Sequence, residues 1–231
     1  MRVLVACEFS GVVRDAFIAA GHDAISCDLL PTDVPGPHIQ GDILEVLNGY
    51  GVIGQAFDLM IAHPPCTYVC RSGLHWNSRV PGRAQKTVDA LKFIDILLNA
   101  PIHRIALENP VGLISTKIRK PDQIIQPWQF GHGETKTTCL WLKGLPPLQP
   151  TDIVVPEWAV REDGSIHLSA QGKRDTPTHF LTGRTTRILK GEQLKQWNRI
   201  HREPPSPERW RNRSRTYAGI ATAMAEQWAG A

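Results

Sequence analysis

The segment FDLMIAHPPC, residues 57–66, decides the fold predicted for this chain. Residues 57–62 form a short, mostly apolar run, which is typical of a strand buried on both faces of a sheet. Pro64 and Pro65 end the run, because proline cannot donate to a strand ladder. Two successive prolines also fix the backbone, so the side chain of Cys66 is held rigidly beyond the strand. The segment therefore predicts a central strand that ends in a reactive thiol.

Strand and helix patterns alternate on both sides of this segment. Gly21 stops the first helical pattern, as glycine does at a helix C-terminus. Further apolar runs lie at 3–6, 23–27, 39–43, 104–107 and 138–142, and helical patterns lie at 12–20, 86–98, 191–201 and 217–228. Short strands that alternate with helices predict an α/β fold, with a mostly parallel sheet and helices on both faces.

A polar or reactive residue follows each predicted strand of the first half. These residues are Glu8, Asp28, Asp42, Cys66 and Glu108. Open α/β sheets bind their ligands beyond the carboxyl ends of the strands. The five residues therefore outline one site.

The composition limits the class of protein. With 231 residues, 42% hydrophobic and 21% charged, the chain can form one main core, which excludes global disorder. No apolar run reaches the ~18 residues of a membrane span, and the N-terminus lacks the pattern of a signal peptide. The five cysteines are an odd number, so we expect reduced thiols and a cytoplasmic location. Cys66 and Cys70 have no second pair to complete a zinc site, so no metal is expected.

The last quarter of the chain is rich in basic residues, interleaved with Trp197 and Trp210. Such a stretch fits a surface that contacts phosphates, although it also fits the solvated face of ordinary helices. The basic residues are Lys173, Arg174, Arg184, Arg187, Lys190, Lys195, Arg199, Arg202, Arg209, Arg211, Arg213 and Arg215.

Cys66 is interpreted in two ways. A free cysteine is often a buried structural thiol, but a thiolate is also a strong nucleophile. Glu108, at the end of the next strand, favours the second interpretation. A carboxyl group beside such a nucleophile can share a proton with an electrophile, provided that burial raises its pKa toward neutrality.

The order of these motifs resembles the S-adenosylmethionine-dependent DNA cytosine-5 methyltransferases, and the small size resembles their compact, phage-type members. The motifs are Phe9-Ser10-Gly11, Asp28, Gly41-Asp42-Ile43, Pro64-Pro65-Cys66 and Glu108-Asn109, within residues 1–115. The resemblance implies a Rossmann-like class I methyltransferase fold. It also implies a catalytic domain at 1–150, a target-recognition region at 151–215 and a C-terminal helix at 216–231 that packs back on the catalytic domain. The expected location is the cytoplasm of a bacterium or of a phage-infected host.

The resemblance implies three catalytic residues. Cys66 would attack C6 of a cytosine that has been flipped out of the duplex. Glu108 would hydrogen-bond or protonate N3 and contact the exocyclic amine. The nearest candidates for the arginine that the family directs at the target base are Lys136 and Thr137, and Lys136 is taken as the catalytic one.

The cofactor implied is S-adenosylmethionine, and the partner is double-stranded DNA, with no membrane and no obligate protein partner. Asp28 would bind the ribose hydroxyls, and Asp42 would bind the adenine amine. The carboxylate of Glu8 would meet the ammonium group of the cofactor. The whole cofactor set is Cys7, Glu8, Phe9, Ser10, Gly11, Asp28, Leu29, Asp42, Ile43 and Pro64, and the DNA set is Arg71, Arg79, Arg83, Arg211, Arg213 and Arg215.

Some features depart from the family pattern and leave alternatives open. The first motif is poor in glycine, and Arg215-Thr216-Tyr217-Ala218-Gly219 stands where the family has an Asn-rich motif. His63-Pro64-Pro65 resembles the (D/N/S)PP(Y/F) signature of enzymes that methylate exocyclic amines. The alternatives are methylation of an exocyclic amine, methylation of cytosine in RNA, and a catalytically silent DNA-binding module. The segment 71–83 is interpreted as a mobile loop that closes over DNA, or as a plain polar connection.

Overall fold

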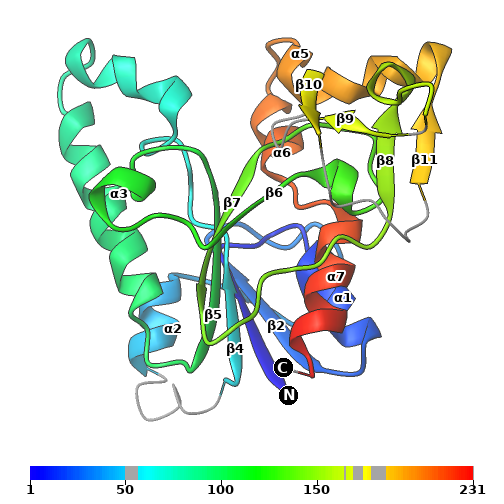
Figure 1. The fold of residues 1–231 in the computed structure, drawn as a ribbon. Coiled ribbons are helices and arrows are strands. Elements are labelled where there is room, and N and C mark those ends of the chain that lie inside the picture. Colours follow the sequence, from blue (N-terminus) through cyan, green and yellow to red (C-terminus); the bar gives the residue numbers. More distant parts are fainter. Residues whose placement is uncertain (50–56, 164, 169–173, 178–185, 231) are drawn as a thin grey trace.

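The computed structural model describes residues 1–49, 57–163, 165–168, 174–177 and 186–230. A seven-stranded sheet in the order β3-β2-β1-β4-β5-β7-β6 forms its centre (Figure 1). Strands β1 to β5 pair in parallel, and β7 runs antiparallel to both β5 and β6. The α/β fold with a mostly parallel sheet is thereby confirmed. The strands are β1 (Arg2–Ala6), β2 (Asp23–Asp28), β3 (His38–Gln40), β4 (Leu59–Ala62), β5 (Arg104–Pro110), β6 (Gln123–Ile125) and β7 (Thr138–Lys143).

Helices cover both faces of the sheet, α2 and α3 on one and α1 and α7 on the other (Figure 1). Successive side chains of a strand point to opposite faces, so Leu4 and Met60 pack with the first pair and Val3 and Leu59 with the second. The helices are α1 (Val12–Ala19), α2 (Ile43–Gly49), α3 (Arg83–Leu98) and α7 (Ala218–Trp228). The strands are therefore buried on both faces, which their continuous apolar sequences require.

A smaller layer lies beside the β7 side of the sheet. β8 pairs in parallel with β11, β9 pairs antiparallel with β10, and a separate apolar cluster around Trp128, Val155 and Trp197 holds them together. The segment of η2 (Arg71–Ser78) and α3 is called the η2–α3 arm. Figure 1 shows the smaller layer and this arm on opposite sides above the carboxyl edge of the sheet. The remaining elements are η2 (Arg71–Ser78), α4 (Ile114–Lys117), η3 (Pro127–Gln129), β8 (Ile153–Pro156), η4 (Glu157–Ala159), β9 (His167–Leu168), β10 (Arg174–Pro177), β11 (Thr186–Leu189), η6 (Gly191–Asn198), α5 (Arg199–Arg202) and α6 (Arg209–Ser214).

Two sequence patterns take a different form in the structure. The apolar run at 39–43 is divided, because β3 stops at Gln40 and Ile43 begins α2. The carboxylate of Asp42 accepts a hydrogen bond from the amide of Leu44 (2.9 Å) and so starts the helix. The helical pattern at 191–201 is a 3-10 helix that passes into α5. Within the described ranges, no helix is both long and apolar enough to span a bilayer.

Candidate active site

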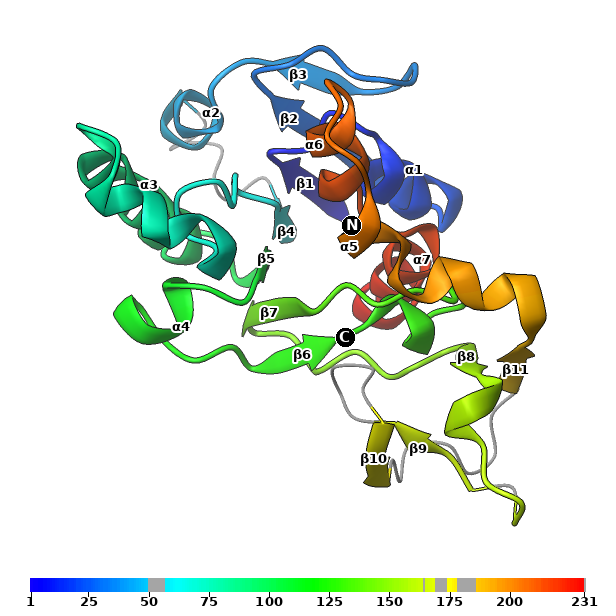
Figure 2. The same cartoon turned by 90° about the horizontal axis from the view of Figure 1, so that it is seen from above.

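The strand register places four site residues in one row. Ala6 is paired with Cys27 and Ala62, and Ala62 is paired with Leu107. The residue after each of these therefore lies at the same edge of the sheet, which Figure 2 shows from above. The row consists of Asp28, Cys7, His63 and Glu108.

Glu108 is held in the row as a carboxylate. Its Oε2 lies 2.8 Å from Nδ1 of His63, and the two side chains are 11% and 10% exposed. Burial raises the pKa of Glu108, but the hydrogen bond from His63, the positive charge of Lys136 and a hydrogen bond from Thr138 outweigh it and lower the pKa overall. The condition for proton sharing stated from the sequence, a pKa raised toward neutrality by burial, is therefore not met in this arrangement.

Lys136 lies near Glu108 and lines the same cavity. Its ammonium group donates a hydrogen bond to the backbone oxygen of Arg215 (3.0 Å) and lies 5.8 Å from the ring centre of Tyr217. A cavity of about 10 Å³ at this point has room for about one water molecule. It is lined by Glu108, Lys136, Thr138, Thr216, Tyr217 and Ile220. A nucleobase would enter it only if the lining moved.

Asn109 connects the turn of Cys66 to β5. Its side-chain amide donates a hydrogen bond to the backbone oxygen of Pro64 (2.7 Å), and both residues are buried. The carbonyl of Cys66 accepts hydrogen bonds from the backbone amides of Val69 and Cys70 (3.1 and 2.9 Å), and these bonds form a single helical turn. Two prolines and one buried amide therefore fix the backbone that carries Cys66.

The surroundings of Cys66 raise the pKa of its thiol. A hydrogen bond to Cys70, burial and the negative charges of Cys70 and Glu108 raise its pKa, and the positive charge of Lys136 opposes them. The pKa of Cys70 is lowered, first by the hydrogen bond from Cys66 and then by Ser72 and nearby amides. The lowered pKa that a cysteine nucleophile uses is thus not present at Cys66, and the half-buried thiol would need to lose its proton during the reaction.

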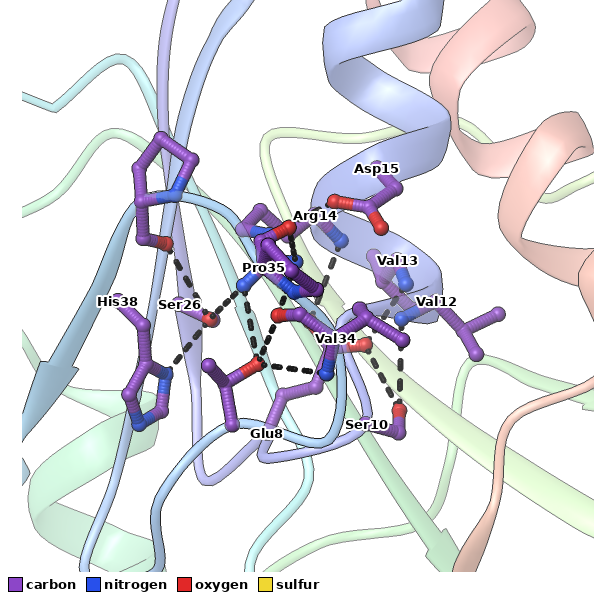
Figure 3. Close-up of polar contacts among 12 residues, drawn as sticks. Glu8, Ser10, Val12, Val13, Arg14, Asp15, Ser26, Val34, Pro35 and His38 are labelled. Carbon is purple, nitrogen blue, oxygen red and sulfur yellow. Dashed lines mark hydrogen bonds and ion pairs between the residues drawn. The ribbon is translucent and has the colours of Figure 1, made fainter.

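Glu8 supports the β1–α1 loop from inside. Its carboxylate is 4% exposed and accepts hydrogen bonds from the amides of Val13 (2.7 Å) and Arg14 (3.2 Å) and from Oγ of Ser10 (3.3 Å) (Figure 3). A carboxylate at a helix N-terminus satisfies amides that have no partner within the helix. Both oxygens are used in this way, so the contact of Glu8 with the ammonium of a cofactor stays a prediction, and the structure shows a second role for this carboxylate.

Arg14 is a buried residue that the sequence patterns did not single out. Its guanidinium donates to Oγ of Ser26, to Oγ1 of Thr32 and to the carbonyls of Val34 and Pro35, at 3.2 to 3.3 Å (Figure 3). These bonds hold the β2–β3 connection against α1. Gly11 and Gly36 were the available signal, because a Cβ on either would lie 2.6 Å from this guanidinium.

The expected cofactor residues divide into exposed and buried groups. After burial, the charges of Asp28 and Asp42 both raise the pKa of the Cys7 thiol, so each carboxylate lies near Cys7. Leu29 is 72% exposed beside them. Ile43 is 4% exposed and packs in the core, so it offers little surface to a ring. Phe9 and Pro64 are buried and Cys7 is partly buried. Cys7 has the positive φ (59°) that usually selects glycine.

The expected DNA residues form two groups. Arg71, Arg79 and Arg83 belong to the η2–α3 arm, where Arg83 donates to the carbonyl of Thr67 (2.9 Å) and Arg79 lies 5.9 Å from the ring centre of Trp76. Arg211 and Arg215 each bind Asp33 at 3.2 Å, and Arg213 is exposed. Lys173 and Arg184 of the basic stretch lie outside the described residues.

A second polar cluster joins the smaller layer to the site. Glu134 is bound by the guanidinium of Arg199 (2.9 Å) and by the hydroxyl of Tyr217 (2.9 Å), whose ring lines the cavity beside Glu108. No sequence pattern pointed to this cluster, because its members are far apart in the chain. Within the described ranges, no group of three or more His, Cys, Asp or Glu residues could hold a metal ion.

Comparisons with known proteins place the chain only by its shape. No family model matches it, and no curated protein matches its sequence. Among solved structures it is similar to a "putative DNA modification methyltransferase encoded within prophage" of E. coli, with 13% identity, a TM-score of 0.40 and coverage of 62% of this chain and 46% of that one. It is also similar to a triple mutant of DNMT2 from Spodoptera frugiperda, with 13% identity, a TM-score of 0.41 and coverage of 89% and 60%. The chain thus spans about half to three fifths of the length of these proteins, and likenesses at this level do not establish its chemistry.

Proposed function

We propose that the chain is an S-adenosylmethionine-dependent methyltransferase that methylates C5 of cytosine in DNA. The observation that supports this most strongly is that Cys66 and Lys136 both lie near Glu108, which belongs to the row of four site residues at the carboxyl edge of the sheet. A protein that only bound a cofactor or DNA would need neither a fixed thiol nor a buried carboxylate beside it.

The residues at this edge fit the cofactor. Carboxylate oxygens of Asp28 and Asp42 are suitable acceptors for two hydroxyl groups and an amine, and the exposed Leu29 offers an apolar surface for a ring. When bound, S-adenosylmethionine supplies an electrophilic methyl group.

Cys66 performs the central step of the proposed reaction. Its sulfur forms a bond to C6 of the flipped base, and its proton passes to a nearby base. Glu108 holds N3, which stabilises the electron pair that moves to C5, and C5 accepts the methyl group. A base then removes the C5 proton, and the sulfur–C6 bond breaks to restore Cys66 and the double bond. Lys136, next to Glu108, stabilises the negative charge that builds up during addition.

The test is incubation of the protein with unmethylated DNA and S-adenosylmethionine carrying an isotope-labelled methyl group, followed by nucleoside mass spectrometry. We expect labelled 5-methyldeoxycytidine from the parent chain and none from Cys66→Ser. Cys70→Ser is the matched control, one helical turn away, and should keep the product. Label on an exocyclic amine, or only in RNA, would replace this proposal by one of the other methyltransferase activities.

A further inference from the structure

His63 is bound to Glu108 through one ring nitrogen, and its other ring nitrogen has no partner in the described part of the chain. Its backbone amide donates to the carbonyl of Ala6 (2.9 Å), and Pro64 follows directly, so the residue is fixed by two strands. Nδ1 lies 2.8 Å from Oε2 of Glu108. Nε2 is buried and has no hydrogen-bond partner among the residues that the structure describes. The imidazole therefore has one polar contact, and it is with the predicted catalytic carboxyl group.

Glu108 must carry a proton to donate a hydrogen bond to N3 of cytosine, but its surroundings favour the ionised carboxylate. N3 of cytosine is a hydrogen-bond acceptor, and a carboxylate has no proton to donate to it. Burial favours the protonated form of Glu108, yet His63, Lys136 and Thr138 keep the carboxylate ionised. A proton must therefore reach Glu108 when the base binds.

His63 is the nearest source of that proton. Its Nδ1 is within hydrogen-bond distance of Oε2, whereas the ammonium group of Lys136 donates to the carbonyl of Arg215. The hydroxyl of Thr138 also bonds Glu108 but does not ionise in the neutral range. Imidazole is the side chain that gains and loses a proton most readily near neutral pH.

We propose that His63 is a positioning residue that orients Glu108 and supplies the proton that Glu108 presents to N3 of the target cytosine. This inference rests on the proposed function. Nδ1 of the imidazolium gives its proton to the carboxylate, and the carboxyl group gives a proton to N3 as the bond between sulfur and C6 forms. His63 ends neutral, Glu108 is again a carboxylate and N3 carries the proton. The proton returns along the same path when the sulfur–C6 bond breaks.

Other titratable groups around the pair do not supply this proton. Burial raises the pKa of the Cys7, Cys139 and Tyr217 groups, and a hydrogen bond to Cys70 raises that of Cys66, so all four stay neutral near pH 7. Cys70 is the exception, because its pKa is lowered, and Cys70→Ser serves as the control for its titration. Cys66, Lys136 and Cys139 interact electrostatically with Glu108, and Tyr217 lines the same cavity as Glu108. Cys7 lies beside His63 in the strand register, and Cys70 interacts with Cys66.

The test compares His63→Gln with the parent chain in methyl transfer as a function of pH. Glutamine keeps an N–H donor near Glu108 but cannot give up a proton. We expect kcat to fall about 100-fold, the usual effect of losing a general acid, while KM for DNA stays unchanged. In the parent chain kcat/KM should fall at high pH, and this fall should be absent in His63→Gln. His103→Gln, an exposed histidine just before β5, should behave as the parent chain does.

The outcomes distinguish this inference from the proposed function. A parent chain that methylates no cytosine would contradict the proposed function. An active parent chain whose His63→Gln variant keeps its rate within threefold, or keeps the fall at high pH, would overturn the role of His63. A proton NMR spectrum gives a second measurement that does not need turnover. A far-downfield signal from the hydrogen-bonded Nδ1–H should be present in the parent chain and absent in both His63→Gln and Glu108→Gln, and its persistence in Glu108→Gln would also overturn the role.

Discussion

Asn109 donates a hydrogen bond to the backbone oxygen of Pro64 across 2.7 Å, and this bond joins the turn that carries Cys66 to the strand that carries Glu108. Because Asn109 is 2% exposed, the bond is shielded from water and fixes the distance between the two reactive side chains.

Asn109→Ala should therefore lower both stability and activity. The carbonyl of Pro64 would be left without its partner, which costs about 1–3 kcal/mol of unfolding free energy. A small shift of Cys66 should lower kcat about 100-fold. Urea unfolding and methyl transfer measure the two effects. Asn99→Ala, at an exposed helix end, is the control, and equal losses in both variants would mean that the bond has no special role.

Lys136→Met should make the stability of the protein depend less on pH. The pKa of Glu108 is lower in the folded chain than in the unfolded one. Its contribution to the free energy of unfolding is therefore complete above the unfolded pKa and is lost as pH falls through the folded pKa. Removing the charge of Lys136 raises the folded pKa toward the unfolded value. The variant should thus lose stability at neutral pH, and its difference from the parent chain should shrink in acid.

Urea midpoints at about pH 7 and about pH 3 check this expectation. Lys143→Met is the matched control, because Lys143 also donates to a backbone carbonyl at 3.0 Å but does not affect the pKa of Glu108. A constant difference between Lys136→Met and the parent chain at both pH values would contradict the electrostatic role of Lys136.

The basic segment at α6 should bind phosphates in competition with Asp33. Arg211 and Arg215 both bind this carboxylate, and the ring of Trp210 lies 5.7 Å from that of Phe9. Asp33→Asn should release the two arginines and steepen the salt dependence of DNA binding. Replacing Arg211, Arg213 and Arg215 by glutamine should flatten it, by about 0.9 in the log–log slope for each lost phosphate contact.

Fluorescence anisotropy of a labelled duplex at several salt concentrations measures these slopes. Arg119, whose partners are Asp122 and the carbonyls of Lys120 and Leu142, provides a control substitution away from α6. Identical slopes in all variants would show that α6 does not contact the DNA backbone.

Glu8→Gln should destabilise α1 without a direct effect on ligand binding. The carboxylate accepts hydrogen bonds from two backbone amides at the helix N-terminus. Loss of its charge should therefore lower the free energy of unfolding by about 1–2 kcal/mol. Glu45→Gln, in the first turn of α2 but exposed, should cost less than about 0.5 kcal/mol. Thermal unfolding compares the two, and a large loss of cofactor affinity at unchanged stability would show that Glu8 contacts the cofactor after all.

The central part of the fold could be predicted because each strand is short, apolar and followed by a marked change in composition. Residues 57–62 and 104–107 are examples, and the polar residues after them define the edge of the sheet. The packing of Glu8 and Arg14 could not be predicted, because their partners depend on a helix start and a loop brought together only by folding. The direction of the pKa shift of Glu108 could not be predicted for a related reason. Burial was visible in the sequence as an apolar strand, but the opposing contacts of His63 and Lys136 come from other elements.

The proposed attack of Cys66 on C6 of cytosine is tested most directly by covalent trapping. The substrate is a DNA duplex that contains 5-fluorocytosine, in the presence of S-adenosylmethionine. Fluorine at C5 cannot leave as a proton does, so the sulfur–C6 bond should persist and join the protein to the DNA. We expect an adduct that survives denaturation and maps to Cys66. It should form with Cys70→Ser and be absent with Cys66→Ser, as the proposed attack requires. Methyl transfer to ordinary cytosine without such an adduct, or an adduct at Cys70, would contradict it.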